Sequence, residues 1–190
     1  METSKANNNR AFTLVEMMVV VGIVIVITGL SFVGYKSGQS QYALQISAQE
    51  LASNLRKAQS MALSTVVTNG GQISGGGYGI YLDKSQNKKL AYTLFADNDA
   101  DSPQTYSGLD KLIETIELKK GVEINNISLT KNGDQPSNPD STYVIFTPPD
   151  PTITIGDNSA DQLSITICLE NATDQTKTIT INKFGKIDIE

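Results

Sequence analysis

One carboxylate beside a long apolar run is the residue with the most evident chemistry in this sequence. Glu16 is followed by Met17–Val33, a stretch without a charged residue. A carboxylate in such a setting is destabilising unless a cation pairs with it, so an acid placed there indicates a function. The chain has no His, which excludes His-based catalysis and His-ligated metals, and no Ser or Cys nucleophile has a His partner. The sequence therefore predicts a protein that is not an enzyme.

A short acidic run is the only pattern that resembles a metal-binding loop. Asp97, Asp99 and Asp101 alternate along the chain, as the first oxygen ligands of a calcium loop do. The positions that an EF-hand fills with Gly and Glu hold Ser102 and Gly108 instead. An acidic turn between strands is therefore the favoured interpretation, calcium is the alternative, and no other cofactor is predicted.

The charge distribution argues against a nucleic-acid surface. The formal net charge of the chain is -5, whereas nucleic-acid binding depends on a concentration of Lys and Arg. Lys183 and Lys186 flank the turn residue Gly185 and could contact DNA, but Asp188 and Glu190 follow at once. We interpret this segment as a solvated strand end.

The apolar run is long enough to cross a membrane. Residues 12–33 would form a helix about 33 Å long, against a hydrocarbon core of roughly 30 Å. The polar leader 1–11 carries Lys5 and Arg10, which places it in the cytoplasm and the rest of the chain outside. A cleaved secretory signal is the alternative, but the closest imitation of its cleavage site, at 28–31, is poor.

The helix is expected to continue beyond the apolar run. Residues 42–63 contain no Gly or Pro. Their apolar side chains recur at helical spacing and form one stripe: Leu44, Ala48, Leu51, Leu55, Ala58 and Ala62. The pattern predicts one helix over about 12–64, running through Gly34 and Gly38. Its first half would meet lipid or other helices, and its amphipathic half, 34–64, needs an apolar partner in the same molecule.

The residues around Glu16 match a known family. The sequence RAFTLVEM, from Arg10 to Met17, resembles the class III signal of type IV pilins and type II secretion pseudopilins. The resemblance implies that prepilin peptidase cuts between Ala11 and Phe12 and methylates Phe12, and that Glu16 is the acid at the fifth mature position. The family almost always has Gly where this chain has Ala11, so processing is expected to be slower.

The resemblance gives Glu16 a physical role. After the cut, Phe12 carries an α-amino cation, and the Glu16 of one subunit can pair with the amino terminus of its neighbour. The pair offsets the cost of each charge in an apolar setting, and breaking it leaves one charge stranded. Glu16 would thereby set the register between subunits.

Beyond the helix, residues 65–190 are predicted to form an exported β-rich domain. Alternating apolar residues predict strands, and 171–175 is predicted as a hairpin connection. The lone Cys168 cannot form an internal disulfide and is interpreted as a small residue on one face of a strand. A mainly antiparallel sheet packed on the helix gives an α+β, pilin-like fold. The predicted strands are 78–82, 89–96, 112–118, 122–129, 143–147, 163–169, 178–182 and 187–189.

This domain is similar to the GspH/FimT-type minor pseudopilins. The main departure is Asp150-Pro151, where a Gly is expected after Pro. The similar stretches are 59–63 at the helix end, the strand 78–81, the segments 95–99 and 146–148, and the closing segment 179–187.

The prediction is a structural minor subunit of a type II secretion pseudopilus or a type IV pilus. It would be anchored in the bacterial inner membrane by one span, with its C-terminal domain outside the cytoplasm. Its partners would be the prepilin peptidase/methyltransferase and other pilins or pseudopilins. The alternatives are a FimT-like minor pilin in DNA uptake, and a membrane-anchored binding module that never polymerises. The sequence leaves open whether the subunit serves secretion, a pilus or competence.

Overall fold

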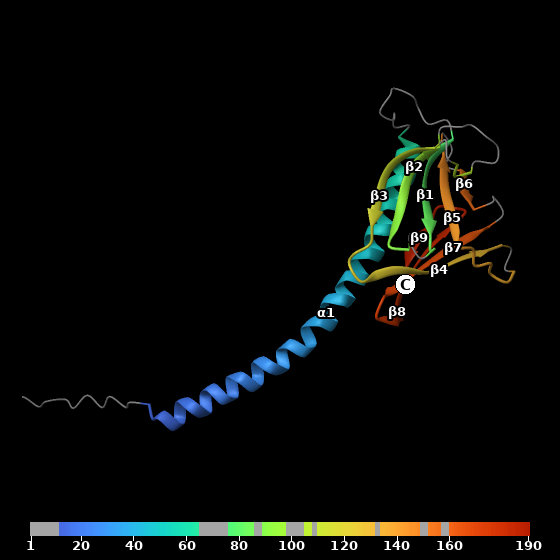
Figure 1. The fold of residues 1–190 in the computed structure, drawn as a ribbon. Helices are drawn as coiled ribbons and strands as arrows, with labels where there is room; N and C mark the ends of the chain where they lie inside the picture. The colour runs from blue at the N-terminus through green and yellow to red at the C-terminus, as the bar shows by residue number, and fades with distance from the viewer. Residues whose placement is uncertain are drawn as a thin grey trace, which may run out of the picture. The chain divides into compact units, whose positions relative to one another are not determined.

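The computed structural model describes residues 12–64, 76–85, 89–97, 105–107, 110–131, 134–148, 152–156 and 160–190, with the backbone alone for 31–37. These residues form one α-helix and nine β-strands (Figure 1). The chain divides into two compact units, Met1–Gln39 and Ser40–Glu190. We call the second the globular unit.

Helix α1, Leu14–Leu63, confirms the predicted helix to within two residues at each end. It begins after Thr13, whose hydroxyl accepts a hydrogen bond from the backbone N–H of Glu16 at 3.2 Å. The helix ends at Leu63, and the backbone N–H of the next residue, Ser64, donates a hydrogen bond to the carbonyl of Ser60 at 2.9 Å. The backbone is helical throughout, including at Gly34 and Gly38.

The predicted apolar stripe is buried in the globular unit. All six of its members are at most 5% exposed, whereas Arg56 and Lys57, which fall off the stripe, are exposed. The stripe belongs to one core cluster together with residues from both sheets described below. Tertiary packing of this face therefore holds the second half of the helix on the sheets.

The strands form two sheets, not the single sheet that the sequence predicted. All neighbouring strands are antiparallel, as expected. The five-stranded sheet has the order β3-β2-β1-β5-β6, with β1 Gly77–Asp83, β2 Ala91–Asp97, β3 Lys111–Glu117, β5 Ser141–Thr147 and β6 Thr152–Ile155. The four-stranded sheet has the order β4-β7-β8-β9, with β4 Val122–Thr130, β7 Gln162–Leu169, β8 Ala172–Asn182 and β9 Ile187–Ile189.

One strand was not predicted, and one connection is shorter than predicted. Strand β6 was not predicted, because Pro148, Pro149 and Pro151 come just before it in the sequence and Pro argues against a strand. The hairpin predicted at 171–175 is confirmed, since β7 and β8 pair antiparallel, but its connection is shorter than predicted because β8 begins at Ala172. The pairing between β7 and β8 shifts register there, since Cys168 pairs with Thr176 but Leu169 pairs with Ala172. The turn-like residues after Ala172 therefore lie at a local irregularity of the β7–β8 ladder.

Polar contacts tie the helix to both sheets. The side-chain amide of Asn54 donates to the Tyr92 hydroxyl on β2 at 2.8 Å. Arg56 donates to the backbone carbonyl of Ile187 on β9 at 3.3 Å. The buried Ser47 hydroxyl accepts from the backbone N–H of Lys119, in the turn between β3 and β4, at 3.1 Å. The helix thus forms the common support for the two sheets.

Candidate functional site

The first turn of α1 places Glu16 in a defined local geometry. Thr13 precedes the helix and Glu16 is its third residue, which is the Thr-x-x-Glu spacing of a capping box. The Thr13 hydroxyl accepts from the Glu16 N–H, and an acid in a first turn interacts favourably with the helix dipole. The sequence analysis did not recognise Thr13 as the cap, although the Thr-x-x-Glu pattern before an apolar run is the signal that identifies one.

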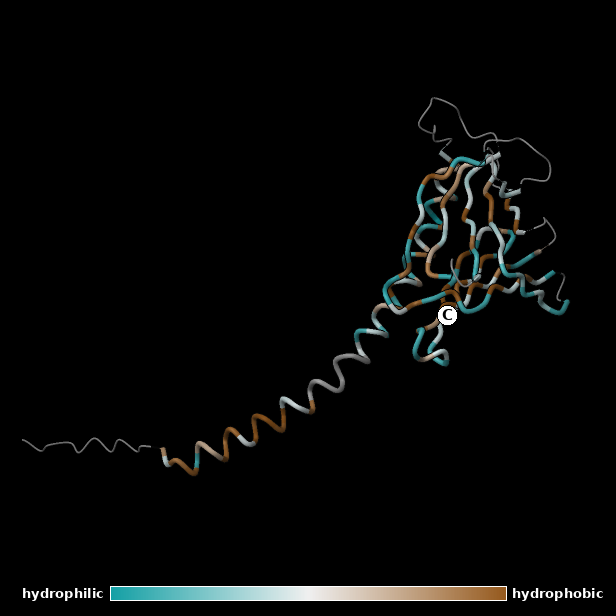
Figure 2. Tube along the Cα trace, in the orientation of Figure 1, coloured by the Kyte–Doolittle hydropathy of each residue, from teal (hydrophilic) through white to brown (hydrophobic). Residues whose placement is uncertain are grey.

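The large apolar side chains from Met17 to Leu30 are all exposed in the single chain. The least exposed is Val20 at 49%, and Leu30 is 73% exposed. Figure 2 shows this stretch as a nearly continuous apolar segment. So large an unpartnered apolar surface is a surface for association with lipid or with other helices.

Among the residues whose side chains are described, no helix is both long and apolar enough to span a membrane.

The predicted cleavage position lies at the start of the described chain. Ala11 and the leader lie outside the described residues, whereas Phe12 is described and is 72% exposed. Phe12 precedes the helix, so the predicted cleavage point adjoins backbone that is not part of a helical segment.

The acidic run predicted as a calcium candidate is described only in part. Asp97 ends β2 and is fully buried, while Asp99 and Asp101 lie outside the described residues. A Cβ added at Gly76 would fall 2.2 Å from the Asp97 carboxyl carbon, so this carboxylate packs against the chain just before β1. Within the described part of the chain no three His, Cys, Asp or Glu side chains gather as metal ligands. The favoured acidic turn and the calcium alternative are both untested by the described residues.

Cys168 has the structural role that the sequence predicted. It is fully buried in β7, and its Sγ lies 4.0 Å from Oε1 of Glu123. Burial is the main cause that raises the pKa of the Cys168 thiol, which disfavours the reactive thiolate. Glu123 also pairs with Lys89 at 2.5 Å, and this hydrogen bond raises the pKa of the Lys89 ammonium.

The two lysines at the β8–β9 turn are both paired with acids. Lys183 lies 2.6 Å from Asp161, and Lys186 lies 2.7 Å from Asp188. Their charges are therefore largely offset on the domain itself.

Both parts of the chain match known families. Residues 6–32 match the family model for the prokaryotic N-terminal methylation motif, and residues 47–185 match that for the type II transport protein GspH. The chain belongs to the GspH family. It is a pilin-like minor subunit, a pseudopilin or minor pilin, as the sequence predicted. Membership in this family implies processing by a prepilin peptidase and assembly with other pilins in a filament.

Crystal structures of the type IV minor pilin FimU from Pseudomonas aeruginosa resemble the GspH-family chain at low identity. In space group P65, FimU gives a TM-score of 0.43 at 15% identity, covering 77% of this chain and 92% of FimU. In space group P21 the values are 0.41 and 13%, covering 77% and 87%. A search of curated proteins gives no significant match.

The family assignment decides among the sequence-based alternatives. The α+β fold, with one long helix packed on antiparallel sheets, is confirmed. The minor-subunit function is confirmed at the level of the family, and neither DNA uptake nor a non-polymerising anchor is favoured. The roles of Ala11, Phe12 and Glu16 stay predictions.

Proposed function

We propose that prepilin peptidase cuts this GspH-family subunit between Ala11 and Phe12 and methylates Phe12. The match to the methylation motif over residues 6–32 includes this bond and supports the assignment. The exposed position of Phe12 ahead of the helix is also compatible with a processed and modified terminus. The methyl transfer and the cleavage are chemistry of the peptidase, and the subunit itself is not an enzyme.

The new amino terminus then pairs with Glu16 of a neighbouring subunit. Glu16 is exposed and, within the described residues, forms no ion pair of its own. An apolar helical surface follows it directly, so helices packed along that surface would surround the carboxylate with apolar groups. A cationic partner becomes necessary in that setting, and the Phe12 amine is the one that processing creates.

The subunit is anchored in the inner membrane by residues 12–33 before assembly, with residues 65–190 outside the cytoplasm. The exposed apolar side chains after Glu16 and the basic residues of the leader support this placement. The match of residues 47–185 to a type II transport protein supports a type II secretion pseudopilus as the filament.

One observation carries the proposal: a single acid lies in the first turn of a helix whose large apolar side chains are all exposed from Leu14 to Leu30, inside a segment that matches the methylation motif. Mass spectrometry of the native protein tests it. We expect a mature chain that begins with N-methylated Phe12. An intact Met1, or trimming near Ser31, would contradict the cleavage.

Two variants give matched controls for that measurement. Ala11→Gly restores the residue typical of the family and should speed processing. Ala11→Gln places a long side chain at the same position and should leave the full-length precursor. Equal processing of all three chains would show that position 11 does not define the cleavage site.

A further inference from the structure

We propose that the four-stranded sheet binds a neutral oligosaccharide in a polar groove along β7, β8 and β9, with the ring of Phe184 at one end. The volume of this groove is about 340 Å³, within the range of roughly 300 to 1,000 Å³ that is usual for binding sites. The inference goes beyond the proposed function, because it assigns a ligand to the globular unit. We call the cavity the sheet groove, and its residues on β7 and β8 are Gln162, Ser164, Thr178, Thr180 and Asn182.

The sheet groove lies on the face of the sheet that is turned away from the core. Side chains alternate between the two faces of a strand, and Ile165, Ile179 and Ile181 are fully buried in the core cluster that contains the helix stripe. Ser164 and Thr180 alternate with them and are only half-buried. Assembly through helix α1 would therefore leave this face accessible to a ligand.

The hydrogen-bonding groups of the groove are held on paired strands. Ser164 of β7 lies opposite Thr180 of β8, and Thr180 lies opposite Asp188 of β9. At the next pair along, the hydroxyl oxygens of Thr166 and Thr178 lie 3.3 Å apart. Groups fixed in this way lose less conformational freedom on binding, which favours the binding of a ligand with many hydroxyl groups.

The lining of the sheet groove matches the hydroxyl groups of a sugar. Every residue that lines it is polar or charged. Ser and Thr hydroxyls and Asn and Gln amides both donate and accept hydrogen bonds, as sugar hydroxyls do. The centre of a protein interface is instead rich in apolar side chains, which this groove lacks. From Thr178 to Asn182 the groove follows roughly 13 Å of strand, which suits an oligosaccharide better than a single sugar.

The charges in the sheet groove favour a neutral ligand. Lys186 lies 2.7 Å from Asp188 in the same groove, so each of these charges offsets the other. The remaining charged residue that lines the groove is Glu190, which would repel a polyanion. A nucleic acid is therefore disfavoured. A neutral sugar can use the Lys186 ammonium as a donor and the Asp188 carboxylate as an acceptor.

Phe184 supplies an apolar surface near one end of the groove. It is 82% exposed, more than any other large apolar side chain described. Its ring centroid lies 5.6 Å from Lys183 Nζ, which lies 2.6 Å from Oδ1 of Asp161, the residue before Gln162. The ring is therefore near the end of the groove that Gln162 forms. One face of a pyranose ring consists of C–H groups, which can pack on the electron-rich face of an aromatic ring.

The turn that carries Phe184 is ordered by hydrogen bonds to a residue of the groove. The Oδ1 atom of Asn182 accepts from the backbone N–H groups of Phe184 and Lys186, both at 3.0 Å. Gly185, between them, has φ +81°, a conformation that favours glycine. Asn182 therefore ties the aromatic ring to the groove, so the two parts of the site are pre-ordered relative to each other.

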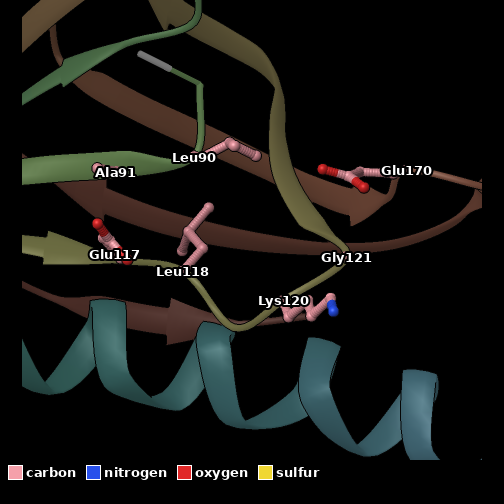
Figure 3. A pocket seen from close by; sticks show the side chains of 7 residues that line it. All are labelled: Leu90, Ala91, Glu117, Leu118, Lys120, Gly121 and Glu170. Carbon is pink, nitrogen blue, oxygen red and sulfur yellow. The ribbon is translucent and has the colours of Figure 1, made fainter. Parts of the chain in front are cut away.

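A second cavity has a different character. Figure 3 shows the Leu90 and Leu118 side chains entering a cavity beside the β3–β4 turn, with the Glu170 carboxylate directed toward it. Leu90 is 46% exposed, so this cavity has an apolar floor. Side chains of both charges line it as well, among them Lys120 and Glu117. That mixed lining selects no class of ligand, whereas the uniformly polar sheet groove selects one.

Isothermal titration calorimetry of the full chain tests the site. The chain is held in a zwitterionic detergent, whose head group contains no sugar, and is titrated with the neutral sugars cellotetraose, maltotetraose and chitotetraose. We expect saturable binding of at least one of them. Tetragalacturonate, an anionic sugar of the same length, should bind at least about tenfold more weakly because Glu190 repels it. Failure of all three neutral sugars to bind, or tighter binding of tetragalacturonate, would overturn the inference.

Substitutions in the two parts of the site provide the controls. Phe184→Ala should weaken binding about tenfold or more, while Phe184→Tyr, which keeps the ring, should stay near wild type. Thr180→Val removes one hydroxyl of the groove and should weaken binding about threefold to tenfold. Thr173→Val, at an exposed position of β8 outside the groove, should leave binding unchanged. Wild-type affinity in either Phe184→Ala or Thr180→Val would overturn the site. Processing at Phe12 and filament recovery should match wild type in all four variants, so the result does not depend on assembly.

Discussion

Helix α1 contains two apolar stretches, one exposed and one buried by the rest of the same chain. From Leu14 to Leu30 the large apolar side chains are all exposed, whereas from Leu44 to Ala62 the apolar stripe is buried. Both stretches are regular helix with apolar side chains in every turn. The difference is that the second stretch belongs to a core built from two sheets, whereas the described residues of the first stretch belong to no buried core cluster. One stretch stabilises the subunit, and the other is available for association.

The polar residues of the two stretches follow the same division. Ser47 and Asn54, beside the buried stripe, have hydrogen-bond partners on Lys119 and Tyr92 of the same chain. The Glu16 carboxylate forms no ion pair with any described residue. A carboxylate without an ion-pair partner among the described residues is therefore the feature that distinguishes the exposed stretch from the buried one.

The largest expected effect is on assembly and follows from removing the charge of Glu16. Glu16→Gln should reduce the subunit recovered in filaments by roughly 100-fold or more. The variant would leave the cationic terminus of a neighbour without its partner, and breaking a buried ion pair costs about 3 to 5 kcal/mol. Quantifying the subunit in sheared filaments against the membrane fraction measures this.

The same substitution separates two roles of Glu16. A Gln at the third helical position can satisfy a capping box as Glu does, so a purely helix-capping role predicts normal assembly of Glu16→Gln. Thr13→Val is the matched control, because it removes the cap hydroxyl and keeps the carboxylate. Assembly that tolerates Glu16→Gln but not Thr13→Val would show that the cap, not the charge, is what matters.

The second prediction compares one large-to-small substitution in each stretch. Leu55→Ala removes a fully buried side chain and should lower the free energy of unfolding by about 2 to 5 kcal/mol. Val24→Ala changes a side chain that is 55% exposed and should change it by less than about 0.5 kcal/mol. Denaturant unfolding of the full chain in detergent measures both. A similar loss in the two variants would mean that the first stretch also has partners within the subunit.

Much of the fold was accessible from the sequence because it depends on periodicity. The helix, the stripe and most strands follow from apolar spacing along the chain, and the burial of Leu51 and Leu55 confirms the interpretation. The family was accessible because RAFTLVEM combines a cleavage motif with an acid at a fixed spacing.

The division into two sheets was not accessible, because it depends on pairing between distant strands. Strand β5 pairs with β1 rather than with β4, its predecessor in the chain, and no local pattern records that choice. The cavity lined by Leu90, Leu118 and Glu170, among others, was not predicted for the same reason, since these residues come from separate segments. The capping role of Thr13 differs, because the Thr-x-x-Glu pattern that indicates it is local and was accessible from the sequence.

The third prediction concerns the effect of alkaline pH on stability, through Tyr92 of β2, which contacts the second half of α1. Tyr92 is buried, and burial is the main cause that raises its pKa from 10.0 to about 12. An unfolded Tyr ionises near pH 10 while the folded one stays protonated, so the stability that this group contributes is lost as the pH rises from about 10 to about 12. The full loss is roughly 2 to 3 kcal/mol. Denaturant unfolding at pH 9 and pH 11 measures part of this decrease.

Two phenylalanine substitutions identify the group responsible. Tyr92→Phe should make the decrease between pH 9 and pH 11 smaller, although it also removes the hydrogen bond from Asn54. Tyr42→Phe changes a side chain that is 67% exposed and should leave the decrease as in wild type. An unchanged decrease in Tyr92→Phe would assign the alkaline instability to other groups.

The smallest expected effect lies on the solvent side of the same helix. Lys57 Nζ lies 3.1 Å from Oε2 of Glu114 on β3, and both side chains are about half exposed. Exposed ion pairs contribute about 0 to 1 kcal/mol, so Lys57→Met should change the free energy of unfolding far less than Leu55→Ala does. Leu55 and Lys57 are only two positions apart, and Leu55 is buried in the core while Lys57 is exposed to solvent. If raising the salt concentration to about 1 M weakens the wild type as much as Leu55→Ala does, then ion pairs, not the buried stripe, hold this half of the helix on the sheets.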